Sequence, residues 1–278
     1  EEVNLETIDD MLEQMQELKT AESAYRKLQT VLAEDEGNLK MLYCQLECAR
    51  RTYETCQAKL IPDTIFLDTM KCFTRFLEEC KKKNGYMFFD RGWWTYRQTS
   101  MAIFRIGELE YERKETDGEK VISIHIPSDA DLSKEAVEDS LNRAKLFFGN
   151  YYPEWKECRY TCNSWLLSLV LKSMLPETSH IRSFQNRFEI VRENKDDREY
   201  IEWLFENLKE GYQKYPGFFA LHSMNFSQEE KARGQQLMQN SWQGILQNML
   251  LVLQKDALVK PDAFDVSFSP EKFVDFIF

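Results

Sequence analysis

The stretch Val121–Val191 decides the fold. It begins as V-I-S-I-H-I-P-S-D-A-D at 121–131, continues as S-K-E-A-V-E-D-S-L-N-R-A-K-L-F-F at 133–148, and returns as C-R-Y-T-C-N-S-W-L-L at 158–167. The first segment alternates as a strand does, and the second carries an apolar stripe at helical spacing. A strand joined to the next by a full helix is usually parallel to it, through a right-handed crossover. We therefore predict a βαβ unit, then a helix around 169–175 and a third strand at 188–191.

The residues just before this stretch predict an antiparallel hairpin. Residues 102–112 alternate as one strand, T-D-G-E at 116–119 is a tight-turn signal, and residues 120–126 return as the partner strand. Pro127 ends the ladder because it has no N–H to donate. A hairpin beside a βαβ unit makes the predicted sheet mixed.

Helical patterns dominate both ends of the chain. Apolar stripes at 5–33 and 39–60 predict two antiparallel helices, Pro62 opens a further helix to Lys83, and G-W-W-T-Y-R-Q lies in a short helix within 88–100. After residue 192 the pattern is helical again. We expect an α+β fold: a helical N-terminal domain at 1–100, an α/β core at 101–205, and a helical C-terminal extension at 206–278. The two N-terminal stripes either form core or serve as a homodimerisation arm.

Composition limits the classes of function. The formal net charge of -11 argues against a nucleic-acid partner, since phosphate binding needs a basic surface. No apolar run approaches the roughly 20 residues of a membrane-spanning helix. The seven cysteines form no C-x-x-C pair and the three histidines lie far apart, so we expect no metal site. Reduced thiols packed as small apolar groups suggest a cytoplasmic protein.

A few residues of the βαβ unit are candidates for chemistry. His125 shares a strand face with Ser123, and an imidazole titrates near neutral pH, so it is either a general base or a structural histidine. Asn163 and Ser164 on the later strand are further catalytic candidates. The loop before the helix either attracts an anion to the helix N-terminus, or serves only to cap that helix through Asp131 and Ser133.

Several of these segments resemble a known family. I-P-D-T-I-F-L-D-T-M, G-W-W and A-I-F-R-I-G-E-L-E-Y-E, between residues 61 and 112, resemble the N-terminal half of a bacterial acyltransferase-domain family. I-H-I-P, the L-S-K-E-A-V helix start, C-N-S-W-L-L, L-P-E-T-S-H-I and F-Q-N-R-F resemble its C-terminal half. That half is similar to the GNAT acyltransferase fold. The resemblance covers roughly residues 60–205.

The resemblance implies a function and a site. In the GNAT fold acyl-CoA lies between two splayed parallel strands, with its pyrophosphate at the start of the following helix. The residues that would hold acetyl-CoA or another acyl-CoA are Ile126, Ser128, Asp129, Leu132, Ser133 and Lys134. His125 or an ordered water would take the proton of a small-molecule or peptide amine acceptor. The alternative is a catalytically inactive GNAT-like module for protein–protein interaction, which the glycine-free, acidic loop favours.

Overall fold

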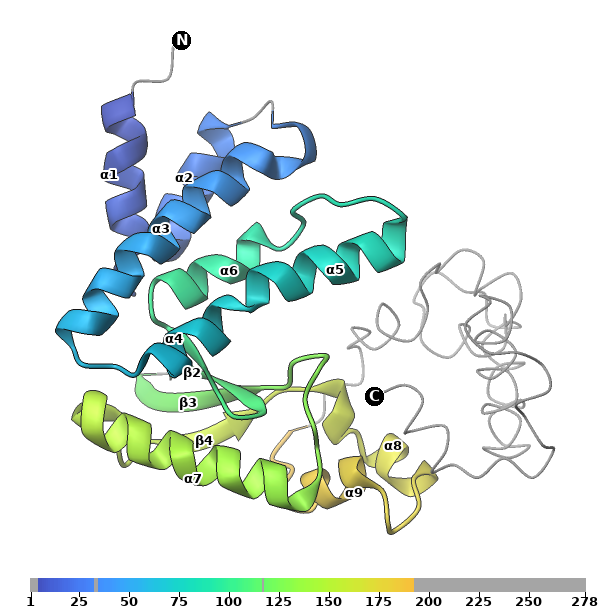
Figure 1. Ribbon diagram of the computed structural model, residues 1–278. Coiled ribbons are helices and arrows are strands. Elements are labelled where there is room, and N and C mark those ends of the chain that lie inside the picture. Colours follow the sequence, from blue (N-terminus) through green and yellow to red (C-terminus); the bar gives the residue numbers. More distant parts are fainter. Residues whose placement is uncertain (1–4, 33–34, 117, 193–278) are drawn as a thin grey trace. The chain divides into compact units, whose positions relative to one another are not determined.

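The computed structural model describes residues 5–32, 35–116 and 118–192 (Figure 1). Contacts divide the chain into two compact units, the first ending at Asn163 and the second beginning at Ser164. The described part combines helices with one four-stranded mixed sheet, so the α+β prediction is confirmed. The helices expected within 206–278 lie outside the described residues.

The first apolar stripe forms two helices rather than the single one expected. They are α1 (Leu5–Met15) and α2 (Ala21–Val31), and the second stripe forms α3 (Leu39–Ala58) after the short 3-10 helix η1 (Glu36–Asn38). Between α1 and α2 the Thr20 hydroxyl donates to the Gln14 carbonyl at 2.7 Å. A threonine side chain that bonds the backbone in this way competes with helix continuation. No glycine or proline marks this break in the sequence.

The helix expected from Pro62 to Lys83 is interrupted at Lys71. It forms α4 (Asp63–Met70) and α5 (Cys72–Asn84), and the expected short helix follows as α6 (Gly92–Thr99). Near the break, the Thr69 hydroxyl donates to the Ile65 carbonyl at 2.7 Å and accepts from the Arg105 N–H at 2.9 Å. This one side chain therefore joins α4 to the first strand of the sheet.

The sheet has the order β1–β2–β3–β4, with one more strand in its antiparallel part than the sequence predicted. Residues 102–112 are not one strand: β1 (Ile103–Ile106) and β2 (Leu109–Thr116) pair antiparallel across the two-residue turn Gly107–Glu108. Gly107 has φ +67°, which a glycine adopts without strain. The second hairpin is confirmed, because β2 pairs antiparallel with β3 (Glu119–His125) and Thr116 opposes Glu119.

The βαβ unit is present, but its second strand is short. Helix α7 (Lys134–Tyr151) and the 3-10 helix η2 (Pro153–Trp155) connect β3 to β4 (Arg159–Cys162), which pairs parallel to β3. The strand expected over 158–167 ends at Cys162. The ladder is unbroken from Val121–Arg159 to Ile124–Cys162, so these strands do not separate within the paired positions.

The two faces of the sheet differ in character, as the strand side chains alternate between them. On one face Tyr111 meets Ser140 and Phe148 of α7. On the other face Glu110 binds Arg75 of α5, and Glu112 lies near Arg97 of α6. In Figure 1, α7 covers the first face and α4–α6 lie on the opposite side. The second face is therefore polar although helices cover it.

The second unit is helical in its described part. It contains η3 (Trp165–Leu167), α8 (Leu169–Met174) and α9 (His180–Gln185). The strand expected at 188–191 is absent from this part of the chain. Its apolar residues have other surroundings, since Phe188 packs on Phe184 at 5.0 Å between ring centroids and Val191 is 90% exposed.

Candidate functional site

The polar face of the sheet brings His125 next to a buried carboxylate. In the β2–β3 register Glu110 opposes His125 and Glu112 opposes Ser123, so all four side chains share one face. The His125 Nε2 atom lies 2.9 Å from Glu112 Oε2. This is a contact between diagonal neighbours, within the reach of long side chains on a sheet.

Two side chains of helix α6 contact the His125–Glu112 pair on the polar face of the sheet. The Trp94 indole meets the His125 ring edge to face, with 4.9 Å between centroids and 89° between planes. Arg97 Nη1 lies 3.6 Å from Glu112 Oε1, the carboxylate oxygen that His125 does not use. The Arg97 guanidinium also stacks over Trp94 at 4.4 Å. Trp94, Arg97, Glu112 and His125 thus form one cluster, which we call the His125 cluster.

Charge in this cluster favours an ionised Glu112. Burial by itself would raise the pKa of Glu112, but the hydrogen bond with His125 and the charge of Arg97 outweigh it and lower the pKa below its ordinary value. An ionised carboxylate only accepts hydrogen bonds. The shared proton therefore lies on His125 Nε2, and a neutral ring has its lone pair on Nδ1. Among the described residues Nδ1 meets no hydrogen-bond partner.

The loop from β3 to α7 follows His125 directly and is held by two arginines. Asp129 Oδ1 lies 2.7 Å from Arg105 Nη1 and 3.3 Å from Arg75 Nη1. Arg75 also binds Glu110 at 2.7 Å. Burial would raise the pKa of Asp129, but Arg105 and Arg75 lower it on balance. The Asp129 carboxylate is therefore ionised and committed to protein partners.

The rest of the loop is tied down by its own hydrogen bonds. Ser128 Oγ donates to Glu79, and the Asp131 N–H donates to Glu108 Oε2 at 2.8 Å. The Ser133 N–H and hydroxyl both donate to Asp131, at 2.8 and 2.9 Å. Ser133 precedes α7, but its side chain makes no cap hydrogen bond to the helix. The interpretation of Ser133 as a side-chain cap is therefore wrong.

The acidic side chains of this loop are engaged by partners within the protein. Asp129 is paired with Arg105 and Arg75, which also pair with Glu108 and Glu110, and Asp131 accepts hydrogen bonds from Ser133. Leu132 is buried and Ile126 half-buried, whereas Ser128 and Lys134 are exposed. An 18-residue helix begins at the end of this loop, and helix N-termini attract anions. Neighbouring Glu79 and Glu108 still make the surroundings acidic.

The two other catalytic candidates lie at the boundary between the units. Asn163 is exposed and is the last residue of the first unit. Ser164 belongs to the second unit, where its hydroxyl accepts from the Leu166 N–H at 3.2 Å and opens η3. This is a local capping bond. The catalytic roles of Asn163 and Ser164 stay predictions.

Sequence reasoning missed Glu112, Trp94 and Arg97. A signal for Glu112 was available, because the Asp-Gly turn signal of the sequence predicts the register in which Thr116 opposes Glu119, and that register places Glu112 on the same face as His125. No local pattern pointed to Trp94 or Arg97, whose contacts depend on how α6 packs on the sheet.

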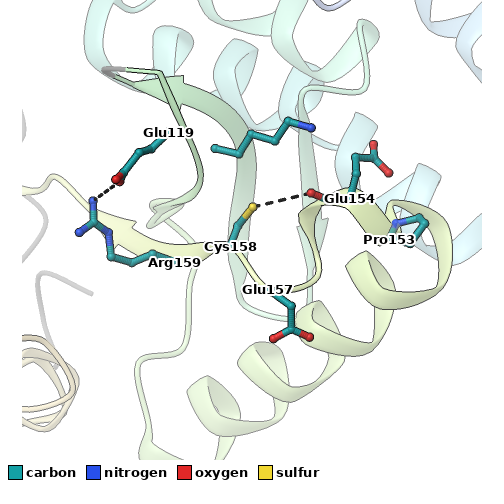
Figure 2. Close-up of a pocket in the computed structure, with 7 residues that line it drawn as sticks. Glu119, Pro153, Glu154, Glu157, Cys158 and Arg159 are labelled. Carbon is teal, nitrogen blue, oxygen red and sulfur yellow. Dashed lines mark hydrogen bonds and ion pairs between the residues drawn. The ribbon is translucent and has the colours of Figure 1, made fainter.

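A shallow hollow opens at the opposite end of β3. It has a volume of about 520 Å³ and is lined by Glu119, Lys120, Pro153, Glu154, Glu157, Cys158 and Arg159. Figure 2 shows Arg159 facing Glu119, and Cys158 pointing toward the Glu154 carbonyl. His125 lies six residue steps along β3 from Glu119, a span of about 20 Å. This hollow is therefore remote from the His125 cluster.

Residues 5–32, 35–116 and 118–192 contain neither a membrane-spanning helix nor a metal-binding cluster. No helix among them is long and apolar enough to cross a bilayer. Within the same residues no group of three or more His, Cys, Asp and Glu side chains is placed to hold a metal ion.

Comparisons with solved structures show where this fold occurs. An acyltransferase crystallised with decanoyl-CoA is 24% identical with a TM-score of 0.57, over 72% of this chain and 61% of that one. An acyltransferase in complex with decanoyl-CoA and teicoplanin is 21% identical with a TM-score of 0.57, over 69% and 59%. This chain thus spans about three-fifths of each of those proteins. These likenesses establish a shared fold. A comparison with curated proteins finds no match.

Family models account for most of the sequence. The N-acyltransferase N-terminal domain matches residues 2–101, and the GNAT-like C-terminal domain matches residues 103–224. The first match contains Trp94 and Arg97, and the second contains Glu112, His125 and the loop before α7. The chain therefore joins an N-acyltransferase N-terminal domain to a GNAT-like C-terminal domain.

Proposed function

We propose that this protein transfers an acyl group from acyl-CoA to an amine. The observation that carries the proposal is the His125–Glu112 pair at the end of β3, directly before a loop and a helix N-terminus. A base is needed in such a reaction, since the attacking nitrogen must lose a proton as its bond to the acyl carbon forms. The shared fold of acyltransferases solved with decanoyl-CoA supports the same reaction class.

The proposed chemistry assigns one role to each part of the site. The amine nitrogen bonds to the thioester carbonyl carbon, the carbon–sulfur bond breaks, and CoA leaves as the thiol. His125 takes the proton that the amine gives up and returns a proton to the solvent or the leaving sulfur. The products are an amide and CoA, so atoms and charge balance. No acyl-enzyme is required, and Ser164 has no nucleophilic role in this scheme.

The loop before α7 is the proposed cofactor site. Ile126, Ser128, Asp129, Leu132, Ser133 and Lys134 are the residues we assign to it. The N–H groups of Asp131 and Ser133 already donate to carboxylates, so the backbone N–H groups of the first turn of α7 are the ones that suit the phosphates, and the Lys134 ammonium adds a positive charge. Because Arg105 and Arg75 bind the Asp129 carboxylate, that residue contributes through its backbone rather than its side chain.

The proposed acyl donors are acyl-CoAs of short and long chain length, and the proposed acceptor is an amine. Relatives of the same fold were solved with decanoyl-CoA and teicoplanin, so we include long acyl chains beside acetyl-CoA. For this chain we propose an amine on a small molecule or peptide. The donor series in the experiment below decides between a short and a long acyl group.

A second function, a binding module without catalysis, is favoured by one observation. Helix α3 carries an exposed apolar stripe, with Leu39 65%, Tyr43 75% and Leu46 46% exposed at spacings of four and three residues. Such a stripe suits packing against another helix. A homodimer through the N-terminal helices would bury it. In that case the His125 cluster would be structural.

The test of the proposed function is a calorimetric titration of the whole chain with CoA, acetyl-CoA, octanoyl-CoA and decanoyl-CoA. Ser133→Glu places a new carboxylate in the loop, and at ~6 Å from a phosphate it opposes binding by about 0.7 kcal/mol, or roughly threefold. Asn150→Glu, at the far end of α7, is the matched control and leaves binding unchanged. The absence of any heat from all four ligands at millimolar concentration would refute the enzyme proposal in favour of the binding module.

A further inference from the structure

We propose that Glu112 is a positioning residue that keeps the proton of neutral His125 on Nε2, so that Nδ1 is the nitrogen that accepts the proton of the amine. The catalytic half of this inference rests on the function proposed above. The structural half, which nitrogen carries the proton and why, stands on geometry alone.

His125 and Glu112 are paired directly. The 2.9 Å separation between Nε2 and Oε2 is a normal hydrogen-bond distance. Glu112 is buried and the His125 side chain is 21% exposed, so water competes weakly for this bond. A hydrogen bond between an ionised carboxylate and a ring N–H is of the charge-assisted kind, which is stronger than a neutral bond.

The neighbours of this pair on α6 support the same arrangement. Arg97 approaches Oε1 at 3.6 Å, which leaves Oε2 for His125. Trp94 lies between them in contact, since it stacks under Arg97 and packs against the His125 ring. The edge-to-face packing on Trp94 sets the plane of the ring, and the hydrogen bond with Glu112 selects which nitrogen faces the carboxylate. The imidazole therefore has a fixed orientation as well as a fixed proton.

The charged groups on this face of the sheet also leave Glu112 as the partner of His125. Glu110 also lies on this face and opposes His125 in the register, but its carboxylate is bound by Arg75 at 2.7 Å. Lys114 follows on the same strand and is exposed. Glu112 is therefore the carboxylate that remains for His125. If the Glu112–His125 pair served stability alone, no particular tautomer of His125 would be needed. The tautomer therefore separates a positioning role of Glu112 from a purely stabilising one.

The test is nuclear magnetic resonance of the full-length protein labelled with ¹⁵N-histidine. His125 is one of three histidines, with His180 and His222, and His125→Gln identifies its signals. Long-range ¹H–¹⁵N correlations at neutral pH report which nitrogen bears the proton. We expect the Nε2–H form, with an Nε2–H proton protected from exchange with water. Glu112→Gln can donate its amide to Nε2 and is expected to shift the proton to Nδ1.

Glu115→Gln is the matched control, because it makes the same change on the same strand at an exposed position. It is expected to leave the His125 tautomer unchanged. A wild-type protein with the proton on Nδ1, or with a rapidly exchanging Nε2 proton, would overturn the inference without any variant. A Glu112→Gln protein that keeps the wild-type tautomer would overturn it too.

Kinetics then separate the inference from the proposed function. Glu112→Gln is expected to lower kcat at least about 100-fold while KM for the acyl-CoA stays within twofold, because the misplaced proton affects only the chemical step. If the tautomer shifts but the wild type transfers no acyl group, the proposed function fails and the positioning role of Glu112 holds. If transfer is normal in Glu112→Gln, the positioning role fails and the function stands.

Discussion

The Ser140 hydroxyl of α7 joins the β1–β2 hairpin to the helix by hydrogen bonds. Replacing Ser140 by alanine is therefore expected to destabilise the protein. Its hydroxyl donates to the Ile106 carbonyl at 2.5 Å, and accepts from the Leu109 N–H at 3.3 Å and the Tyr111 hydroxyl at 2.8 Å. One donor and two acceptor positions are thereby filled. Ser140 and Tyr111 are both fully buried, so water cannot replace the lost bonds in Ser140→Ala.

The magnitude follows from the groups left without a partner. An unsatisfied buried polar group costs about 1–3 kcal/mol, and Ser140→Ala leaves the Tyr111 hydroxyl in that state. The Leu109 bond is longer and falls at the lower end of the range. The free energy of unfolding is therefore expected to drop by about 2–4 kcal/mol in Ser140→Ala.

Urea denaturation followed by tryptophan fluorescence measures this loss, and a double-mutant cycle tests its cause. Tyr111→Phe removes the phenol hydroxyl that Ser140→Ala would strand. In the double variant the loss should be smaller than the sum of the single losses by about 1 kcal/mol or more. Strict additivity, or a Ser140→Ala protein as stable as wild type, would refute the reasoning.

Three further predictions concern the turn, acid and thiols. Gly107→Ala should lower the melting temperature by several degrees more than Gly118→Ala, since both have positive φ but only at Gly107 would a Cβ meet Ser140, at 3.1 Å. Equal losses would contradict this. Burial raises the pKa of Glu112, but His125 and Arg97 lower it by more, so the pKa in the folded protein lies below 4.5. The stabilisation that ionised Glu112 provides is therefore present above pH 4.5 and is lost as the pH falls through the lowered pKa. Urea midpoints between pH 6 and pH 3 should fall less in Glu112→Gln than in wild type. Iodoacetamide at neutral pH should alkylate Cys158 well before Cys72, because burial strongly raises the pKa of the Cys72 thiol. Equal rates by peptide mass spectrometry would contradict the described burial.

The elements with strong local signals were predictable from sequence. The Asp-Gly turn signal in the sequence predicted the β2–β3 hairpin, and the apolar stripe at 133–148 with its flanking strands predicted the parallel pair. The turn at Gly107–Glu108 was missed, because the alternation of residues 102–112 continues through it. A lone glycine in a strand pattern was the available warning. The absence of a strand at 188–191 shows that a short segment with three apolar residues does not by itself define a strand.

The candidate site was only partly accessible to sequence reasoning. His125 stood out because an imidazole at the end of a strand is chemically distinctive. Its carboxylate partner, Glu112, lies thirteen residues earlier and could be predicted only from the strand register. The contacts of Trp94 and Arg97 depend on how α6 packs on the sheet and could not be predicted from a local pattern. Pairing of Asp129 with Arg75 and Arg105 brings together three segments far apart in sequence. The charge of the loop sequence alone therefore did not show that the Asp129 carboxylate is paired within the protein.

The central claim is that His125 takes the proton of an amine during acyl transfer, and one measurement tests it most directly. Release of the CoA thiol from octanoyl-CoA is followed with and without small primary amines, in wild type and in His125→Gln. The account predicts amine-dependent release by wild type and a loss of about 10²–10⁴-fold in kcat for His125→Gln, with acyl-CoA affinity retained. Equal rates in the two proteins, at matched acyl-CoA occupancy, would contradict it.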